Sequence, residues 1–423
     1  MSKRKRISNL NIICISIIFI AQLLVVMSVI PPKTLKSNEF IGTYDYPLKF
    51  YFAKTSKAML LDNEISGFES AYNESSLLSK LHLVAYDQNS KRFTGIGVQT
   101  DKLTTIIMTA FFFLPDIYLF KFYVFFLLLS LPIFIHFSAI NFGLNKCEAF
   151  FSSLLFIFVC HFQFDYASMM YWGMYSSMFG LVLSVYASSL LFKRGFSYDA
   201  IIKFAFLAML SVMSNILLVV PITIMFFVCT SREKLSDTLN LLRKFVFGHW
   251  LFFSLLGITV IFLCYILFNN AAGFVEKNEP ASDPFSVAKG FESLIWELER
   301  RPVMISLYVW GFFSMMALLK WKKGKTLAYF ILPSALLFFF IGYFGHIIDF
   351  LQFIKPRRLT NALLLLMIFP ISMYVSKIRG SRRWKKRRSL IILIMVVLTG
   401  IYLLIFINNI TYDHSLGFVK ETR

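Results

Sequence analysis

Long windows without a charged side chain constrain this sequence more than any other feature. Whole windows of about 20 residues, the length of a membrane span, lack Asp, Glu, Lys and Arg, and the chain is 57% hydrophobic and only 16% charged. In lipid such windows must be helices, because a helix satisfies its own backbone groups. Outer-membrane barrels instead alternate polar and apolar residues over strands of about 10 residues. The sequence therefore predicts an all-α polytopic membrane protein.

About eleven transmembrane helices are expected. Nine are apolar runs at 9–30, 117–140, 147–162, 173–192, 247–268, 303–320, 326–345, 359–377 and 389–408. The other two come from segment 199–230, which would be about 48 Å of helix, too long for one crossing and too short for two full ones. Because Ser211, Ser214 and Asn215 interrupt this segment, it is predicted to form a hairpin of two short helices. Its turn, at Ser214 and Asn215, would be buried in protein or line a cavity.

The basic residues indicate how the spans are oriented. The formal net charge is +20, and the expected inner segments carry 24 of the 43 Lys and Arg but only 4 of the 23 Asp and Glu. This distribution follows the positive-inside pattern of membrane proteins and gives no support to a nucleic-acid partner. The run 9–30 is interpreted as an uncleaved signal-anchor. We expect a multi-pass protein of the cytoplasmic (plasma) membrane, with its N-terminus inside and its C-terminus outside.

Residues 31–116 are expected to form a long first outer loop that carries interfacial helices. One apolar stripe recurs there at helical spacing, at Leu48, Phe52, Thr55 and Met59. Lysines stand on the other faces, at Lys49, Lys54 and Lys57. This pattern is typical of an amphipathic helix on the membrane surface, and a second one is expected at 103–114. No soluble C-terminal domain is expected, so residues 1–423 are interpreted as a single membrane domain.

A late outer loop keeps basic residues where the topology does not require them. Arg357 and Arg358 stand directly before a span, and His346 and Gln352 precede them in the same loop. Paired guanidinium groups suit phosphate oxygens, which they grip through parallel hydrogen bonds. The alternative is that these side chains extend to phospholipid headgroups.

Two carboxylates on the expected outer face are candidate catalytic groups. Asp45 follows the first span and stands between Tyr44 and Tyr46. A carboxylate near an acceptor hydroxyl can act as a general base, a role worth about 10²–10⁴ in rate. The alternative is a solvated loop acid, since the loop contains several others. Asp165 lies in a short outer loop among aromatic residues, where the simpler interpretation is a surface acid.

The sequence resembles the GT-C superfamily of membrane glycosyltransferases. Four segments carry the resemblance: GTYDYPLKFYF, LPIFIHFSAINFGLNKCEAF, YWGMYSSMFG and QFIKPRRLTNALLLL. They are most similar to bacterial and archaeal membrane proteins labelled as 6-pyruvoyl-tetrahydropterin-synthase-related. The resemblance implies that Asp45 is the catalytic carboxylate, that Asp165 is a second one, and that Arg357 or Arg358 contacts a lipid phosphate. Unlike the metal-using members, the chain has no Asp-x-Asp or Glu-x-Asp at residue 45 or 165.

The expected function is transfer of a sugar from a polyprenyl-phosphate donor to a glycan or protein acceptor at the outer membrane face. The expected catalytic residues are Asp45 and Asp165, and the expected substrate contacts are Arg357, Arg358, His346, Gln352, Ser214 and Asn215. The expected partners are membrane lipids, the donor and the acceptor. No cofactor is expected, and the six scattered His give no support to a metal site. The alternatives are a transporter or flippase of a lipid-linked or anionic substrate, a glycan polymerase or ligase, or a non-catalytic protein of envelope biogenesis.

Overall fold

The structure is a computed structural model of the chain. It describes residues 3–29, 49–50, 53–54, 57, 85–87, 92–94, 101–162, 175–215, 218–230, 302–319, 321–345 and 359–380. The chain divides into two compact units, Met1–Ile371 and Ser372–Arg423. The second unit is described only over the last residues of one helix, so the packing below is that of the first unit.

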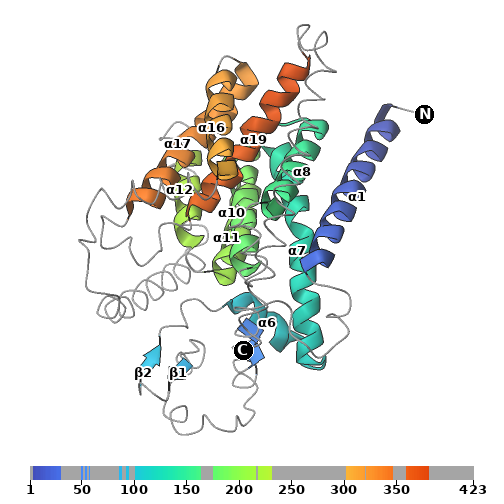
Figure 1. Cartoon of the computed structure of the whole chain (residues 1–423), viewed down its shortest axis with the longest axis vertical. Helices are drawn as coiled ribbons and strands as arrows, with labels where there is room; N and C mark the ends of the chain where they lie inside the picture. The colour runs from blue at the N-terminus through green and yellow to red at the C-terminus, as the bar shows by residue number, and fades with distance from the viewer. Residues whose placement is uncertain are drawn as a thin grey trace. The chain divides into compact units, whose positions relative to one another are not determined.

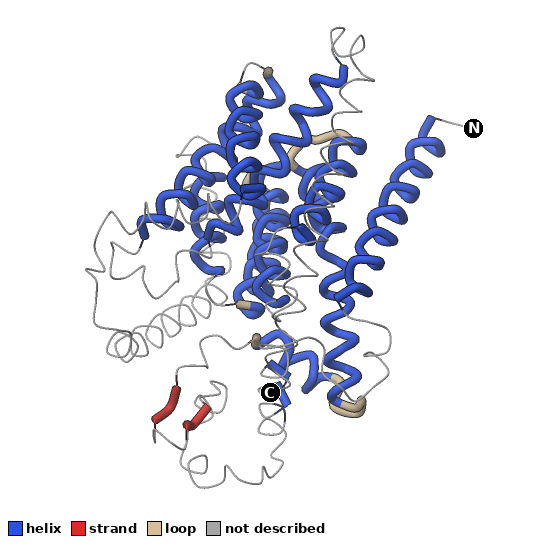
Figure 2. Tube along the Cα trace, viewed as in Figure 1, coloured by secondary structure: helices blue, strands red, loops and turns tan. Residues whose placement is uncertain are grey.

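The described residues form ten helices and one pair of short strands (Figures 1 and 2). The helices are α1 (Lys3–Val29), α6 (Lys102–Ala110), α7 (Asp116–Asn141), α8 (Lys146–Phe162), α10 (Tyr175–Arg194), α11 (Tyr198–Ser214), α12 (Val219–Thr230), α16 (Pro302–Leu318), α17 (Lys322–Phe344) and α19 (Leu359–Gly380). The strands β1 (Ala85–Asp87) and β2 (Arg92–Thr94) pair antiparallel, with Tyr86 opposite Phe93. The prediction of a helical fold is confirmed for the described part of the chain.

Four of the described helices are long and apolar enough to cross a bilayer. They are α7, α10, the Gly324–Phe344 part of α17 and the Leu359–Lys377 part of α19. Shorter apolar stretches lie within α1, α12 and α16. The 26 residues of α7 extend over about 39 Å, more than the hydrocarbon core of about 30 Å. These helices bear out the prediction of a membrane protein.

Side-chain caps explain where three helices begin. Asn145 and Glu148 cap α8 reciprocally: the Asn145 N–H donates to Glu148 Oε2 over 2.8 Å, and the Glu148 N–H donates to Asn145 Oδ1 over 3.0 Å. Ser197 accepts from the Ala200 N–H at the start of α11, and Asp101 accepts from the Thr104 N–H at the start of α6. Each cap satisfies a backbone donor that the first turn of a helix leaves open.

A proline in α7 is the point where α1, α7 and α8 are joined. Pro132 has no N–H, so the carbonyl of Leu128, four residues earlier, has no intrahelical donor. The buried Gln22 of α1 donates its Nε2–H to this carbonyl over 2.9 Å. Ser153 of α8 donates to the Pro132 carbonyl, also over 2.9 Å. The Gln22 amide thus replaces the donor that Pro132 lacks, and Ser153 adds a second hydrogen bond to α7 at the proline.

Small residues bring α10 and α11 into close contact. A Cβ atom added at Gly180 would lie 2.3 Å from Leu218 Cδ1 and 2.9 Å from the Ser211 carbonyl oxygen. Ser211 donates to the Gly180 carbonyl over 2.6 Å and lies 2.7 Å from the Ser184 hydroxyl. Small side chains that allow backbones to approach, with hydroxyls bonded across, are typical of helix pairs in membranes. This contact makes α10 a central helix, and every residue from Tyr175 to Val185 is buried.

Helix contacts also fix which helix ends lie together. Asn141, the last residue of α7, is hydrogen-bonded to Ser189 and Lys193 near the end of α10. At the other end, Tyr175, the first residue of α10, packs against Phe120 of α7 with ring centres 6.0 Å apart. α7 and α10 therefore run in the same direction. We name the two ends of this unit the Asp116 end and the Asn141 end, after the first and last residues of α7.

Aromatic packing continues the core at the Asn141 end. The Phe142 ring centre lies 5.2 Å from that of Phe192 and 4.9 Å from that of Phe369 in α19. Phe330 of α17 packs against both Phe142 and Phe192, at 5.3 and 5.5 Å. Such edge-to-face and tilted pairs add to the stability that burial provides. They place the interior of α17 and α19 beside the end of α7.

Candidate functional site

Most of the predicted site residues lie outside the part of the chain that the structure describes. These are Asp45, Asp165, His346, Gln352, Arg357 and Arg358. Ser214 and Asn215 are described, and they stand where α11 ends, four residues before α12 begins. The site is therefore built from these two residues and from the polar side chains that surround the same end of α10.

Asn215 binds the end of α11 to α10, whereas the Ser214 hydroxyl is bonded within α11. The Ser214 hydroxyl donates to the Leu210 carbonyl within its own helix, over 2.9 Å. Asn215 leaves the helical conformation, and its Nδ2–H donates to the Ser177 hydroxyl over 2.5 Å. Both residues are buried. Ser177, the partner of Asn215, directly follows Ser176, which forms a second polar contact.

Lys49 forms that contact. Its ammonium donates to the Ser176 hydroxyl over 2.8 Å and lies 4.5 Å from the centre of the Tyr175 ring. A cation over the face of an aromatic ring is attracted by the negative charge density there. Lys49 belongs to GTYDYPLKFYF and Ser176 to YWGMYSSMFG. Two of the four motifs singled out in the sequence, 127 residues apart, therefore meet at the Asp116 end.

Asp101 supplies the carboxylate of the same cluster. It is only 4% exposed, caps α6 through the Thr104 N–H at 3.1 Å, and also accepts from the Thr104 hydroxyl. Because that hydroxyl proton points to Asp101, the Tyr175 hydroxyl, 3.1 Å away, donates to Thr104 Oγ1. A proton-donor chain thus runs from Tyr175 through Thr104 to Asp101. We name Lys49, Asp101, Thr104, Tyr175 and Ser176 the Asp101 cluster.

Burial dominates the electrostatics of this carboxyl group. Loss of water raises the pKa of Asp101 above its ordinary value, because a low-dielectric surrounding disfavours the charged form. The positive charge of Lys49 and the hydrogen bonds from Thr104 and Tyr175 oppose the shift without cancelling it. The cluster is therefore an acid held in a dry environment beside one cation, an arrangement found in catalytic and in structural sites alike.

Aromatic rings enclose the cluster on the side of α7. Tyr175 is fully buried and packs edge-to-face against Phe120 and Tyr123, at 6.0 and 6.4 Å between ring centres. Phe50, the residue after Lys49, packs against Phe120 at 5.4 Å. These contacts fix the position of Tyr175 and thereby the surface over which the Lys49 ammonium lies.

A second ion pair connects the same segment to the start of α7. Lys57 pairs with Asp116 and donates to the Phe112 carbonyl over 3.3 Å. Lys57 is buried, as are Phe50 and Ala53, whereas Lys54 is exposed. The sequence placed Lys57 on a face away from the apolar stripe, yet in the structure its side chain faces the protein. The pairing with Asp116 explains this, since a buried ammonium requires an opposite charge.

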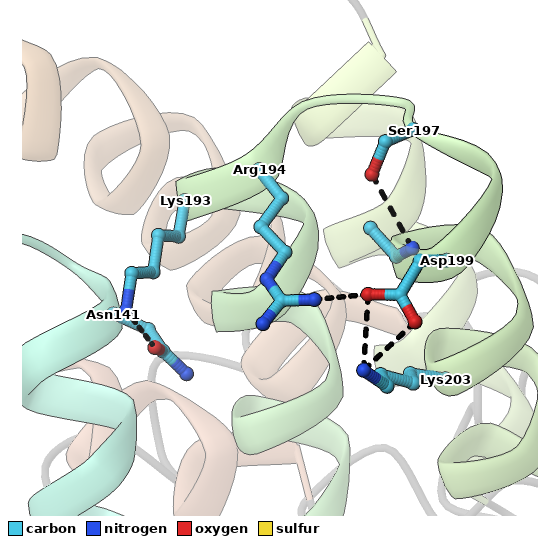
Figure 3. Close-up of polar contacts among 7 residues, drawn as sticks. Asn141, Lys193, Arg194, Ser197, Asp199 and Lys203 are labelled. Atoms are coloured by element: carbon cyan, nitrogen blue, oxygen red, sulfur yellow. Dashed lines mark hydrogen bonds and ion pairs between the residues drawn. The ribbon is translucent and has the colours of Figure 1, made fainter.

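The Asn141 end carries charges of a different kind (Figure 3). Asp199 at the start of α11 is exposed and pairs with Arg194 and with Lys203, whose Nζ lies 2.8 Å from Oδ1. The hydrogen bond from Lys203, followed by the charges of Lys203 and Arg194, lowers the pKa of Asp199 below its ordinary value. Solvent screens these contacts, so this end carries a solvated set of ion pairs rather than a buried site.

Sequence reasoning missed Asp101, although a signal was present. Asp101 and Thr104 stand three residues apart immediately before an apolar run, which is the pattern of a helix N-cap. The burial of Asp101 and its association with Lys49 could not be read from that pattern, because they depend on the packing of segments 52 residues apart. Among the described residues, no group of three His, Cys, Asp or Glu could hold a metal ion.

Comparison with known proteins does not identify a family: neither a protein-family model nor a curated protein matches the chain.

Proposed function

We propose that the chain is an eleven-span protein of the plasma membrane with a long first outer loop over residues 31–116. Its N-terminus is inside and its C-terminus outside. The sorting of polar residues between the two ends of the first unit supports this topology. At the Asp116 end Lys49 and Lys57 are matched by Asp101 and Asp116. At the Asn141 end the three basic residues Lys193, Arg194 and Lys203 outnumber Asp199 (Figure 3). The positive-inside bias then makes the Asp116 end the outer one.

The proposed activity is transfer of a sugar from a polyprenyl-phosphate donor to a glycan or protein acceptor, as in the GT-C superfamily. The Asp101 cluster is the single observation that carries it. Lys49 is anchored on Ser176 and Tyr175, and Asp45 precedes Lys49 by four residues. Four extended residues span at most about 14 Å, so the backbone of Asp45 can lie no farther than this from that of Lys49. An acid and an anchored cation at one end of a membrane bundle suit chemistry on a lipid-linked anion.

In the proposed reaction Asp45 takes the proton of the acceptor hydroxyl as that oxygen attacks the anomeric carbon. The bond from this carbon to the phosphate oxygen breaks, and its electron pair leaves with the polyprenyl phosphate. Arg357 and Arg358 stabilise the charge that develops on the phosphate. Asp165 is the second catalytic carboxylate, His346 and Gln352 contact the substrate, and Ser214 and Asn215 form the wall of the substrate site beside α10.

The described start of α19 supports the role given to the arginine pair. Arg358 directly precedes Leu359, the buried first residue of α19. The next carbonyl, that of Thr360, accepts from the Tyr308 hydroxyl of α16 over 3.0 Å. The first turn of α19, which follows Arg358, is therefore anchored to α16. A firmly held helix start is a suitable support for guanidinium groups that must meet a phosphate at a fixed depth.

Replacement of Asp45 tests this proposal. Membranes containing the full-length chain are incubated with a panel of radiolabelled polyprenyl-phosphate sugars, and release of polyprenyl phosphate is measured. Asp45→Asn should lower turnover by about 10²–10⁴-fold, the usual contribution of a general base. Asp62→Asn, another acid of the same loop, is the matched control and should keep turnover unchanged. Full activity of the Asp45→Asn variant would contradict the assignment.

One observation favours the transporter alternative. Lys121 of α7 is 1% exposed, and an ionisable side chain buried within a span often marks a pathway for ions or anionic substrates. The same vesicles separate the two functions. Transfer of labelled lipid across the bilayer without breakage of its sugar–phosphate bond would favour transport over glycosyl transfer.

A further inference from the structure

The turn between α6 and α7 exposes an unusual run of apolar side chains. Phe111, Phe112, Phe113 and Leu114 are consecutive, and Phe112 and Phe113 are 61% and 68% exposed. Their rings pack on one another, with the Phe113 ring centre 6.1 Å from that of Phe111 and 6.0 Å from that of Phe112. A turn in water does not carry such a run without a function, because exposed apolar patches favour association. We name residues 111–114 the aromatic turn.

The aromatic turn continues into an exposed stripe on α7. Tyr118, Phe122 and Phe126 follow at intervals of four residues, are all exposed, and therefore share one helix face. Phe122 and Phe126 stack with ring centres 5.4 Å apart. Because α7 is long and apolar enough to cross a bilayer, this face is a lipid-facing surface. The aromatic turn extends that surface beyond the start of the helix.

Several polar groups of the aromatic turn are paired within the protein. The Phe111 N–H donates to the Ile107 carbonyl over 3.1 Å, and the Leu114 N–H donates to the Phe111 carbonyl over 3.0 Å. The Phe112 carbonyl accepts from Lys57. Lys57 in turn pairs with Asp116, and only 11% and 22% of these two side chains are exposed. In lipid, non-helical backbone is tolerated only when its polar groups are satisfied by the protein.

We propose that the aromatic turn inserts into the bilayer at the boundary between headgroups and acyl chains. The length of α7 supports this depth, because about 39 Å of helix exceeds the hydrocarbon core by about 9 Å. The start of α7 therefore lies at the headgroup level, and the aromatic side chains reach inward from there by about 5–10 Å, as in other interfacial segments. The partner is the phospholipid surface itself. Insertion holds α6, and with it the Asp101 cluster, at a fixed depth.

Nitroxide labelling measures this depth directly and does not depend on the enzymatic proposal. Phe113→Cys and, as a second variant, Phe112→Cys are made in a background without the five native Cys. Each full-length variant is labelled and reconstituted in phosphatidylcholine–phosphatidylglycerol vesicles. Collision rates with oxygen, which partitions into lipid, and with a water-soluble nickel chelate then give the depth. Phe122→Cys on α7 is the lipid-facing reference, and Lys54→Cys, an exposed lysine of the first loop, is the aqueous reference.

Labels at 112 and 113 are expected to collide more often with oxygen than with nickel, as the label at 122 does, whereas the label at 54 shows the reverse. Nickel access at 112 and 113 equal to that at 54 would overturn the proposal. So would spin–spin broadening that disappears on dilution with unlabelled protein, because it would show that a second copy of the chain covers the turn. Both aromatic positions are exposed, so neither substitution removes a buried contact.

Discussion

Asp101 is a carboxyl group whose surroundings disfavour its charge, and this gives it a distinctive effect on stability. Because burial raises its pKa in the folded protein, the folded state binds more protons than the unfolded state between the ordinary and the raised pKa. Stability from this group is therefore complete below the ordinary carboxyl pKa and is lost as the pH rises through the raised value.

Substitution of Asp101 by Asn tests this behaviour. Asn keeps the N-cap and removes the titration. As the pH rises above about 4, the ordinary value for an aspartate, the thermal midpoint of the wild type in detergent should fall relative to that of Asp101→Asn. A difference that is independent of pH would contradict a buried, raised-pKa carboxyl group.

Asp199 serves as a control, because its pKa is shifted in the direction opposite to that of Asp101. Its pKa is lowered by Lys203 and Arg194, so its contribution is present above the ordinary pKa and is lost as the pH falls through the lowered value. Relative to Asp199→Asn, the wild type should therefore lose stability toward low pH. The effect should also weaken with added salt, because the ion pairs are exposed.

The sequence predicts individual residues less well than it predicts segments. The apolar stripe of the first loop locates a helical segment, but it leaves open the partner of each lysine. Lys57 is buried and pairs with Asp116, 59 residues away. Lys49 donates a hydrogen bond to Ser176 and lies over the Tyr175 ring. A hydropathy pattern records neighbours along the chain, whereas these pairs are created by packing between distant segments.

At the scale of helices, a double-mutant cycle can measure the coupling free energy between Gln22 and Pro132. Gln22→Met removes the donor to the Leu128 carbonyl and should lower the free energy of unfolding by about 1 kcal/mol, within the range for hydrogen bonds between membrane helices. Pro132→Ala restores an intrahelical N–H for the same carbonyl. In the Pro132→Ala background, Gln22→Met should therefore cost close to nothing.

This double-mutant cycle is measured by unfolding in mixed micelles with increasing SDS. Equal costs of Gln22→Met in both backgrounds would show that Gln22 does not act through the carbonyl that Pro132 leaves open. A coupling of similar size to the single-variant cost would establish α1 as an integral part of the bundle.

The elements themselves follow from the sequence where the physics is local. Charge-free windows predict α7, α10, α17 and α19, because length and apolarity alone decide whether a helix can cross a bilayer. The polar residues Ser214 and Asn215 stand where α11 ends in the structure. The hydrogen bond between α1 and α7 could not be predicted, because it requires the Gln22 amide to meet the carbonyl exposed by Pro132.

For the whole molecule, the sequence predicts a membrane protein, and the described helices agree with it. The number of spans and the activity remain predictions. What the structure adds is that Lys49 and Lys57 meet residues of α6, α7 and α10 at one end. The proposed activity requires that end to face outward, where a lipid-linked donor would meet Asp45.

Sidedness is the most direct test of this claim. Two single-cysteine variants are compared in intact cells with a membrane-impermeant maleimide. One retains only Cys147, which is exposed beside the Asn141 end, and the other carries only Lys54→Cys, between the two anchored lysines of the first loop. Labelling of Lys54→Cys in intact cells, with labelling of Cys147 only after permeabilisation, is the predicted result. Labelling of both from the same side, or in the reverse order, would contradict an outward-facing Asp101 cluster.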